Sequence, residues 1–122
     1  MAEKDIKLAE IESRFVALVW QKEPISSGDL VLLCEKELNW KKSTTYTVLR
    51  RLCQKGILKN EEAVVSSVVK REEYMARCSE QIVEDTFDGS LPQFVAAFMS
   101  RKKLSRKQID EIQQLIDGYK ES

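Results

Sequence analysis

The stretch NWKKSTTYTVLRRLCQKGILK, from Asn39 to Lys59, joins a helical apolar pattern to an unusual charge distribution. It contains six Lys or Arg residues and no Asp or Glu, although the 122-residue chain has equal numbers of basic and acidic residues. The pattern predicts a helix from Lys42 to Lys55, with Gly56 at its C-terminal cap. The residues spaced to face a core are Thr45, Val48, Leu49 and Leu52.

The opposite face of this predicted helix carries hydrogen-bond donors. The residues at helical spacing on it are Ser43, Thr47, Arg50, Arg51 and Gln54, with Thr44 and Tyr46 beside them. Hydroxyl and lysine groups bind phosphates, and Arg, Tyr, Thr and Gln can reach base edges in the major groove of DNA. For such a helix taken alone, a basic face in contact with solvent is the alternative. Because Thr47 and Arg51 point away from the apolar stripe, we expect both to be dispensable for folding.

Two further helices are predicted before this segment. The first spans Ala9 to Gln21, and the second begins near Ser26, which precedes Asp29 by three residues as in a capping box. In the first helix the stripe expected to be buried is Ile11, Phe15, Leu18 and Val19. In the second helix it is Leu30, Leu33, Cys34 and Leu38.

A short hairpin is predicted after the basic helix. Two β-favouring runs, Ile57 to Asn60 and Val64 to Val68, are separated by the sequence EEA. Three helices followed by a hairpin is the order of a winged helix-turn-helix domain, in which the third helix reads DNA. In that context DNA binding becomes the leading hypothesis for the donor face.

The second half of the chain is predicted to be helical. One helix runs from Lys70 to Phe87, and two more begin at Ser90 and Ser105, each with a Gln three residues later. These helices have few apolar partners in the same chain, so we expect them to pack against a second subunit; a bundle folded back on the winged domain is the alternative. The predicted dimer interface is Phe94, Val95, Phe98, Leu104, Ile112, Leu115 and Ile116.

The fold class is therefore predicted as mainly α, with a winged helix-turn-helix domain at residues 1–70 and a helical dimerisation region at residues 71–122. The chain has no histidine, and Cys34, Cys53 and Cys78 lie far apart, so we expect no metal site, no cofactor and no catalytic residues. The charged N-terminus and the lack of a long apolar stretch lead us to expect a cytoplasmic protein without membrane insertion.

Three stretches carry a resemblance to the penicillinase repressor family, often called BlaI/MecI/CopY. They are LAEIESRFVALVWQKEPISSGDL, NWKKSTTYTVLRRLCQKGIL and SLPQFVAAFMSRKKLSRKQIDEIQQLI, which together cover nearly the whole chain. The resemblance implies a homodimeric transcriptional repressor, not an enzyme, that binds a pseudo-palindromic double-stranded DNA operator. Trp20 and Trp40 fall on the family's core tryptophans.

The family's DNA-contacting positions fall on Ser43, Thr44, Tyr46, Thr47 and Arg51. With the flanking basic and hydroxyl groups, the predicted DNA-binding residues are Ser26, Ser27, Lys41, Lys42, Ser43, Thr44, Tyr46, Thr47, Arg50 and Arg51. The wing departs from the family, because Glu61 and Glu62 stand where many members carry a basic tip, and phosphate repels carboxylates. A winged-helix module for protein interaction, without sequence-specific DNA binding, therefore stays open.

The resemblance also implies how repression ends. Family members are inactivated by cleavage of an Asn-Phe bond, with a membrane sensor protease acting directly or indirectly, and the matching stretch here is VAAFMS. Its candidate bond joins Ala97 to Phe98, so Ala replaces the family's Asn, and a small residue equally suits a packed helix that is not cleaved. A copper-responsive repressor of the same family is disfavoured, because the end of the chain has no cysteine.

Overall fold

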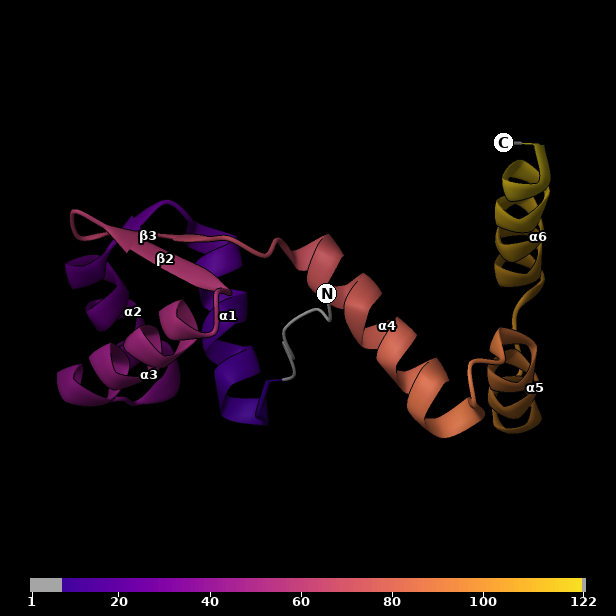
Figure 1. Cartoon of the computed structure of the whole chain (residues 1–122), viewed down its shortest axis with the longest axis horizontal. Helices are drawn as coiled ribbons and strands as arrows, with labels where there is room; N and C mark the ends of the chain where they lie inside the picture. Colours follow the sequence, from indigo (N-terminus) through magenta and orange to yellow (C-terminus); the bar gives the residue numbers. More distant parts are fainter. Residues whose placement is uncertain (1–7, 122) are drawn as a thin grey trace. The chain divides into compact units, whose positions relative to one another are not determined.

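A computed structural model describes residues 8–121 as helices joined to one small sheet (Figure 1). The elements are α1 (Glu10–Lys22), β1 (Ile25–Ser26), α2 (Ser27–Leu38), α3 (Lys42–Gln54), β2 (Leu58–Glu61), β3 (Val64–Ser67), α4 (Arg71–Phe87), α5 (Leu91–Arg101) and α6 (Arg106–Glu121). The predicted mainly-α winged-helix fold is confirmed. Two compact units divide between Ser79 and Glu80, inside α4. The functional division predicted after residue 70 remains a prediction, because compactness alone assigns no role to a unit.

The core of the first unit is made by one face each of α1, α2 and α3 and by the sheet. All four apolar-stripe residues predicted for α3 are buried, as are Leu30 and Cys34 of α2. Burial of this kind contributes about 1.5–3 kcal/mol for each large apolar side chain. Within residues 8–121, the buried hydrophobic residues are Phe15, Val16, Val19, Leu30, Cys34, Val48, Leu49, Leu52, Ile57, Leu58, Val65 and Val69.

In α1 the predicted stripe residues Phe15 and Val19 are fully buried, and Leu18 is half-buried. Ile11 is 42% exposed, whereas Glu12 is only 4% exposed and lies on the buried face with Phe15, Val16 and Val19. Phe15, Val16 and Val19 follow Glu12 by three, four and seven positions, which is the spacing of one helical face. The prediction for Ile11 was wrong because it placed the apolar residue, and not its charged neighbour Glu12, on the buried face. Glu12 can be buried because Arg51 and Lys55 lie beside its carboxylate.

The sheet has the order β1-β3-β2 and is antiparallel throughout. The predicted hairpin is confirmed, with Leu58 opposite Ser67 and Glu61 opposite Val64. Its two-residue tip, Glu62 and Ala63, has φ values of 52° and 63°, which a tight turn between twisted strands requires. The two-residue strand β1, which pairs with β3, has too short a sequence pattern to be predicted.

The end of α1 is tied to β3 and to the start of α4. Trp20 donates from Nε1 to the carbonyl of Val69 over 3.0 Å, and its ring lies 5.5 Å from that of Tyr74. The carboxylate of Glu23 accepts from the Ser67 amide at 2.8 Å and from Lys70 Nζ at 3.2 Å. The first turn of α4 is therefore part of the winged unit.

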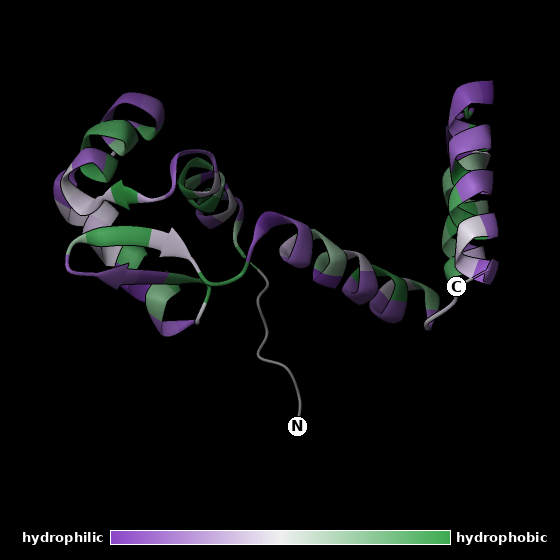
Figure 2. Ribbon diagram, turned by 90° about the horizontal axis from the view of Figure 1, so that it is seen from above, coloured by the Kyte–Doolittle hydropathy of each residue, from purple (hydrophilic) through white to green (hydrophobic). Residues whose placement is uncertain are grey.

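The second unit contains the end of α4 together with α5 and α6. Ser90 Oγ accepts from the Gln93 amide at 3.2 Å, and a reciprocal capping box joins Ser105 to Gln108 at 3.1 Å, so both predicted helix starts are confirmed. Phe87 packs edge-on against Phe94 with ring centroids 5.6 Å apart. Hydrophilic and apolar residues alternate along α4 (Figure 2), as expected for an amphipathic helix.

Two carboxylates of the first unit have lowered pKa values. Burial raises the pKa of Glu12, but the Ala9 amide and the cations Lys55 and Arg51 lower it more, so it lies below its ordinary 4.5. Burial also raises the pKa of Glu23, but hydrogen bonds from Ser67 and the cation Lys70 lower it more. The pKa of Glu23 therefore also lies below its ordinary value. Both groups bind protons more weakly in the folded chain, so their contribution to stability is present above the ordinary pKa and is lost as pH falls through the folded pKa.

We predict that the free energy of unfolding falls as the pH is lowered below about 4.5, where the unfolded carboxylates bind protons first. Glu23→Gln should make this dependence shallower, because one of the two responsible groups is gone. Urea unfolding of the variant and the parent across the acid range measures the effect, with Glu10→Gln, an exposed carboxylate on the same helix, as the control. An equally steep dependence in Glu23→Gln and the parent would contradict the assignment.

Candidate nucleic-acid interface

The turn between α2 and α3 is held by its backbone and by one aromatic pair. Asn39 has φ 57° and ends α2, and its amide donates to the Glu35 carbonyl over 3.2 Å. The next residue, Trp40, stacks on Phe15 of α1 with ring centroids 5.5 Å apart and an interplanar angle of 19°. The turn therefore fixes the start of α3 against α1.

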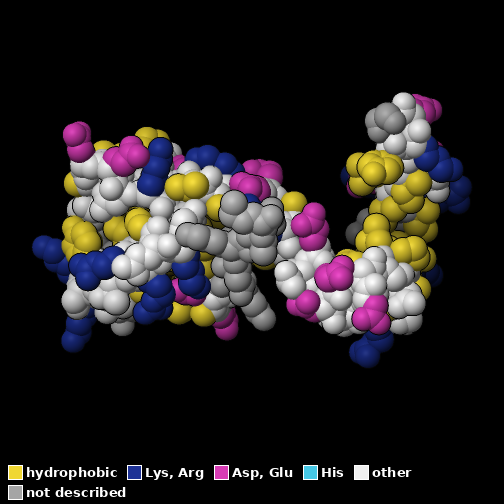
Figure 3. All heavy atoms as spheres, viewed as in Figure 1, with side chains coloured by type: hydrophobic (Ala, Val, Ile, Leu, Met, Phe, Trp, Pro, Cys, Tyr) yellow, Lys and Arg dark blue, Asp and Glu magenta, His cyan; other side chains and the backbone are white. Residues whose placement is uncertain are grey.

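The predicted donor face of α3 is present. Ser43, Thr44, Thr47, Arg50 and Gln54 are exposed, on the side opposite to the four buried residues. Thr47 Oγ1 donates to the Ser43 carbonyl over 2.9 Å, which leaves its oxygen lone pairs and its methyl group available to a partner. Figure 3 shows Lys and Arg side chains gathered on the winged unit in the part that contains α3.

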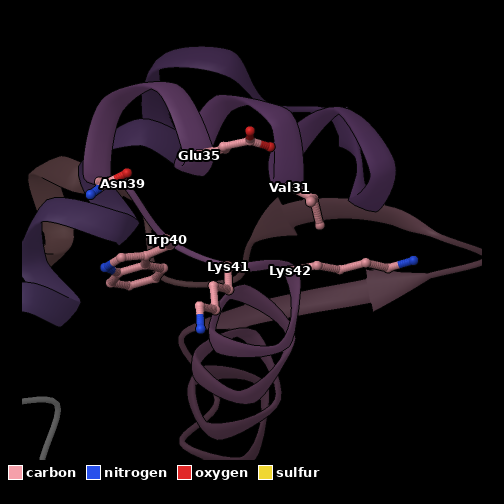
Figure 4. Close-up of a pocket in the computed structure, with 6 residues that line it drawn as sticks. All are labelled: Val31, Glu35, Asn39, Trp40, Lys41 and Lys42. Atoms are coloured by element: carbon pink, nitrogen blue, oxygen red, sulfur yellow. The ribbon is translucent and has the colours of Figure 1, made fainter.

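An open pocket of about 480 Å³ lies where α2 meets the start of α3. It is lined by Val31, Glu35, Asn39, Trp40, Lys41 and Lys42 (Figure 4). Within residues 8–121, Lys41 and Lys42 form no side-chain hydrogen bond or ion pair, and Figure 4 shows them extending in different directions from the first turn of α3. Two unpaired ammonium groups therefore lie beside the positive end of the α3 dipole.

The two serines at the start of α2 have roles in the fold. Ser26 Oγ accepts from the Asp29 amide at 3.0 Å, which is the predicted cap, and the side chain stays exposed. Ser27 is only 8% exposed, and its hydroxyl accepts from the hydroxyl of Tyr46 at 3.4 Å. Tyr46 therefore covers the Ser27 hydroxyl, and the role of Ser27 in DNA binding stays a prediction. Tyr46 is itself half-buried and packs against the core.

Arg51 does not lie free on the donor face. Its Nη1 is 3.5 Å from Oε2 of Glu12, although 53% of its side chain is exposed. Lys55 Nζ lies 3.4 Å from the other oxygen of the same carboxylate. Arg51 is therefore one of two cations beside a buried carboxylate, and the expectation that its removal leaves the fold intact stays a prediction.

The Glu12, Arg51 and Lys55 cluster was missed at the sequence level. Its signal was present, since Glu12 stands three, four and seven residues before Phe15, Val16 and Val19. A carboxylate on a buried helical face requires a partner. The identity of that partner depends on how α1 crosses α3, which local spacing does not give.

The wing is braced against the start of α2. The Ser27 amide donates to the Ala63 carbonyl at the hairpin tip over 2.8 Å, and β1 pairs with β3 up to that point. Glu61 and Glu62 are exposed, and Glu61 lies 3.8 Å from Lys59 on the same strand. The acidic tip predicted from the sequence is therefore on the surface and only partly neutralised.

The residues predicted to contact a second subunit lie on α5, on α6 and between them. Phe94 and Leu104 are half-buried, whereas Leu115 is 74% exposed. Figure 3 shows apolar side chains gathered along α5 and α6. The remaining predicted interface residues, all exposed in the single chain, are Val95, Phe98, Ile112 and Ile116.

The candidate cleavage bond, Ala97-Phe98, lies inside α5. Ala97 is exposed, and its carbonyl accepts from Ser100 Oγ at 2.7 Å. Half of the Phe98 side chain is exposed. The bond is therefore on the surface but in helical backbone.

The three cysteines are free thiols. Burial raises the pKa of Cys34 and of Cys53. Cys34 is fully buried in the core, as predicted for a small hydrophobic residue.

From residue 8 to residue 121, no helix has the length and apolar character that crossing a membrane requires.

Comparison with known proteins identifies the family. The model of the penicillinase repressor family matches residues 8–118. The penicillinase repressor of Bacillus licheniformis is 22% identical over 118 residues, which cover 93% of this chain and 92% of that protein. The methicillin resistance regulatory protein MecI of Staphylococcus aureus is 21% identical over 121 residues, with 96% and 98% of the two chains covered. An uncharacterized 16.5 kDa protein of Latilactobacillus sakei is 28% identical over 120 residues, which cover 95% of this chain and 82% of that protein.

The match spans both units of the structure, including the helix-turn-helix and the helices α5 and α6. It agrees with the resemblance found in the sequence and with the winged-helix fold. The chain belongs to the penicillinase repressor family, whose members are transcriptional repressors and not enzymes.

Proposed function

We propose that this repressor is a homodimer that binds a pseudo-palindromic DNA operator with the α3 helices of its two subunits in successive major grooves. The observation that carries the proposal is the outer face of α3, where exposed hydroxyl, amide and guanidinium groups are held opposite four buried residues. The helix contains no acidic residue, so nothing on it repels a phosphate.

Within this proposal the groups on α3 have different tasks. Lys41 and Lys42, with the amides of the first helical turn, bind phosphates and set the position of the helix. Thr47 and Arg50 contact base edges, since hydroxyl, methyl and guanidinium groups distinguish base pairs in the major groove. The other proposed contacts are Ser26, Ser43, Thr44, Arg51 and the exposed part of Tyr46.

The exposed apolar residues of α5 and α6 support the proposed dimer. A second copy of the chain would cover side chains such as Phe98, Ile112 and Leu115, which are exposed in the single subunit. Linking two DNA-binding units raises the effective concentration of the second unit once the first is bound. This gain supports operator binding by a chain whose formal net charge is zero.

We predict that Thr47→Ala weakens binding to the operator by about 1–3 kcal/mol and relaxes sequence preference, because a base contact is lost. Lys41→Ala and Lys42→Ala should instead weaken binding to all duplexes and reduce the slope of log K against log salt by about one each. Electrophoretic mobility shifts over a salt series, with a duplex that the parent chain selects from a random pool, measure both effects.

Lys102→Ala is the matched control for these variants, because it removes one exposed charge from the end of α5, outside the winged unit. Its salt slope should equal that of the parent. If Thr47→Ala keeps the parent's affinity and sequence preference, α3 is not the helix that reads DNA.

We predict that the double variant Ile112→Asp/Ile116→Asp is a folded monomer. The two residues are 41% and 48% exposed in one subunit, so the charges act mainly on the proposed interface. Sedimentation velocity at micromolar concentration measures the state, and operator affinity should fall by a large factor through lost effective concentration. Gln114→Asp on the same helix is the control and should remain dimeric; a parent chain that sediments as a monomer removes the dimer from the proposal.

We further propose that repression ends by proteolysis at Ala97-Phe98, with a membrane sensor protease acting directly or through a second protease. The support is the matching position in the family motif and the exposure of both residues. Cleavage there would separate the winged unit from α6 and from the end of α5.

The expected product is a chain whose new N-terminus is Phe98, found by mass spectrometry of the repressor from cells treated with a β-lactam. Operator occupancy should fall with the fraction cleaved, because the linked second unit is lost. An intact chain on derepressed genes would contradict cleavage and would indicate a ligand or partner that loosens the dimer.

A second function, protein interaction without sequence-specific DNA binding, is favoured by the acidic wing tip. Glu61 and Glu62 are exposed at the place where a wing would approach a phosphate backbone. Selection from the random duplex pool separates the two functions, since a protein-interaction module enriches no sequence.

A further inference from the structure

Glu12 lies between the core and the DNA-facing helix. Its Oε1 accepts from the Ala9 amide at 3.1 Å, so the carboxylate is fixed to the first turn of its own helix. The same oxygen lies 3.4 Å from Lys55 Nζ, and Oε2 lies 3.5 Å from Arg51 Nη1. The carboxylate is thus anchored by α1 and shared by two cations of the α3 segment.

Arg51 contacts both the buried Glu12 carboxylate and the solvent. One of its nitrogens contacts the buried carboxylate, while about half of its side chain remains in contact with solvent. A guanidinium group has five N–H donors in a rigid plane, so one contact with Glu12 orients the plane and leaves other donors for a second partner. Arg50, the next residue, is exposed and has no side-chain partner within residues 8–121.

We infer that Glu12 is a positioning residue for sequence recognition: it holds the Arg51 guanidinium in one orientation before DNA binds. This inference rests on the proposed DNA-binding function of α3. A free arginine loses rotamer freedom when it binds a base or phosphate, whereas an arginine already held by Glu12 has lost much of it on folding. The contribution of Arg51 to sequence preference therefore depends on Glu12, and that of Arg50 does not.

Loss of Arg51 orientation and loss of the Glu12 charge have different expected effects on DNA binding. Removing the Glu12 charge takes a carboxylate away from the vicinity of DNA, so attraction to phosphates does not decrease. Loss of orientation instead affects the contact that depends on geometry. The readout is therefore the ratio of affinities for a selected and a scrambled duplex, not the affinity for either one alone.

A double-mutant cycle with the full chain tests the inference. The probes are a duplex that the parent chain selects from a random pool and a scrambled duplex of the same composition, and the variants are Glu12→Gln, Arg51→Ala and their combination. We expect Glu12→Gln to lower the affinity ratio roughly threefold or more when Arg51 is present, and to leave it unchanged in the Arg51→Ala background.

Two controls separate positioning from damage to the fold. Arg50→Ala replaces Arg51→Ala in a parallel cycle and should show no coupling to Glu12→Gln. Glu10→Gln removes one negative charge from an exposed position on α1. The affinity ratio of this variant should equal that of the parent. If Glu12→Gln lowers the ratio equally with and without Arg51, Glu12 acts only on the fold and the inference is overturned.

A measurement on the unaltered protein covers the case in which Glu12→Gln does not fold. In nitrogen-15 NMR spectra, the Nη–H protons of Arg51 should exchange with water more slowly than those of Arg50, because Nη1 of Arg51 contacts the Glu12 carboxylate. Equal exchange of the two signals overturns the inference, even if the chain binds its selected duplex. If the parent selects no duplex, the proposed function itself fails, and the role of Glu12 in recognition fails with it.

Discussion

The first unit depends on one constraint: α3 must bury a complete face while its other face stays in water. Val48, Leu49 and Leu52 supply the apolar contacts, and Thr45, which is also buried, donates to the Lys41 carbonyl. The helix packs against α2 and β2, and the stacking of Trp40 on Phe15 fixes its first turn relative to α1. Rotation of α3 about its axis would expose the apolar face, so the direction in which its polar groups point is set by the core.

The same constraint explains why much of the fold could be predicted from the sequence. The stripes of α2 and α3 are separated by three or four residues, and Ser26, Ser90 and Ser105 mark helix starts through contacts within one turn. Such signals are local, so they need no knowledge of how elements cross. The predicted exposure of Ser43, Thr44, Thr47 and Arg50 follows from the same periodicity.

The features that could not be predicted are contacts between distant parts of the chain. Glu12 and Arg51 are 39 positions apart, and Ser27 and Tyr46 are 19 apart, so nothing in their immediate sequence links them. In each pair a residue predicted to face DNA, Arg51 or Ser27, contacts a distant residue of the fold. Periodicity predicts which way a side chain points from its own helix, but the neighbouring element decides whether water or protein lies there.

The braced wing has a consequence for how the molecule would meet a partner. The hairpin tip is hydrogen-bonded to the Ser27 amide, and β1 joins the same strand, so the wing and the start of α2 form one continuous hydrogen-bonded framework. A wing of this kind has little conformational freedom left to lose on association. These hydrogen bonds limit movement of the wing relative to α2, so a partner of this unit would meet a surface that is already formed in the free chain.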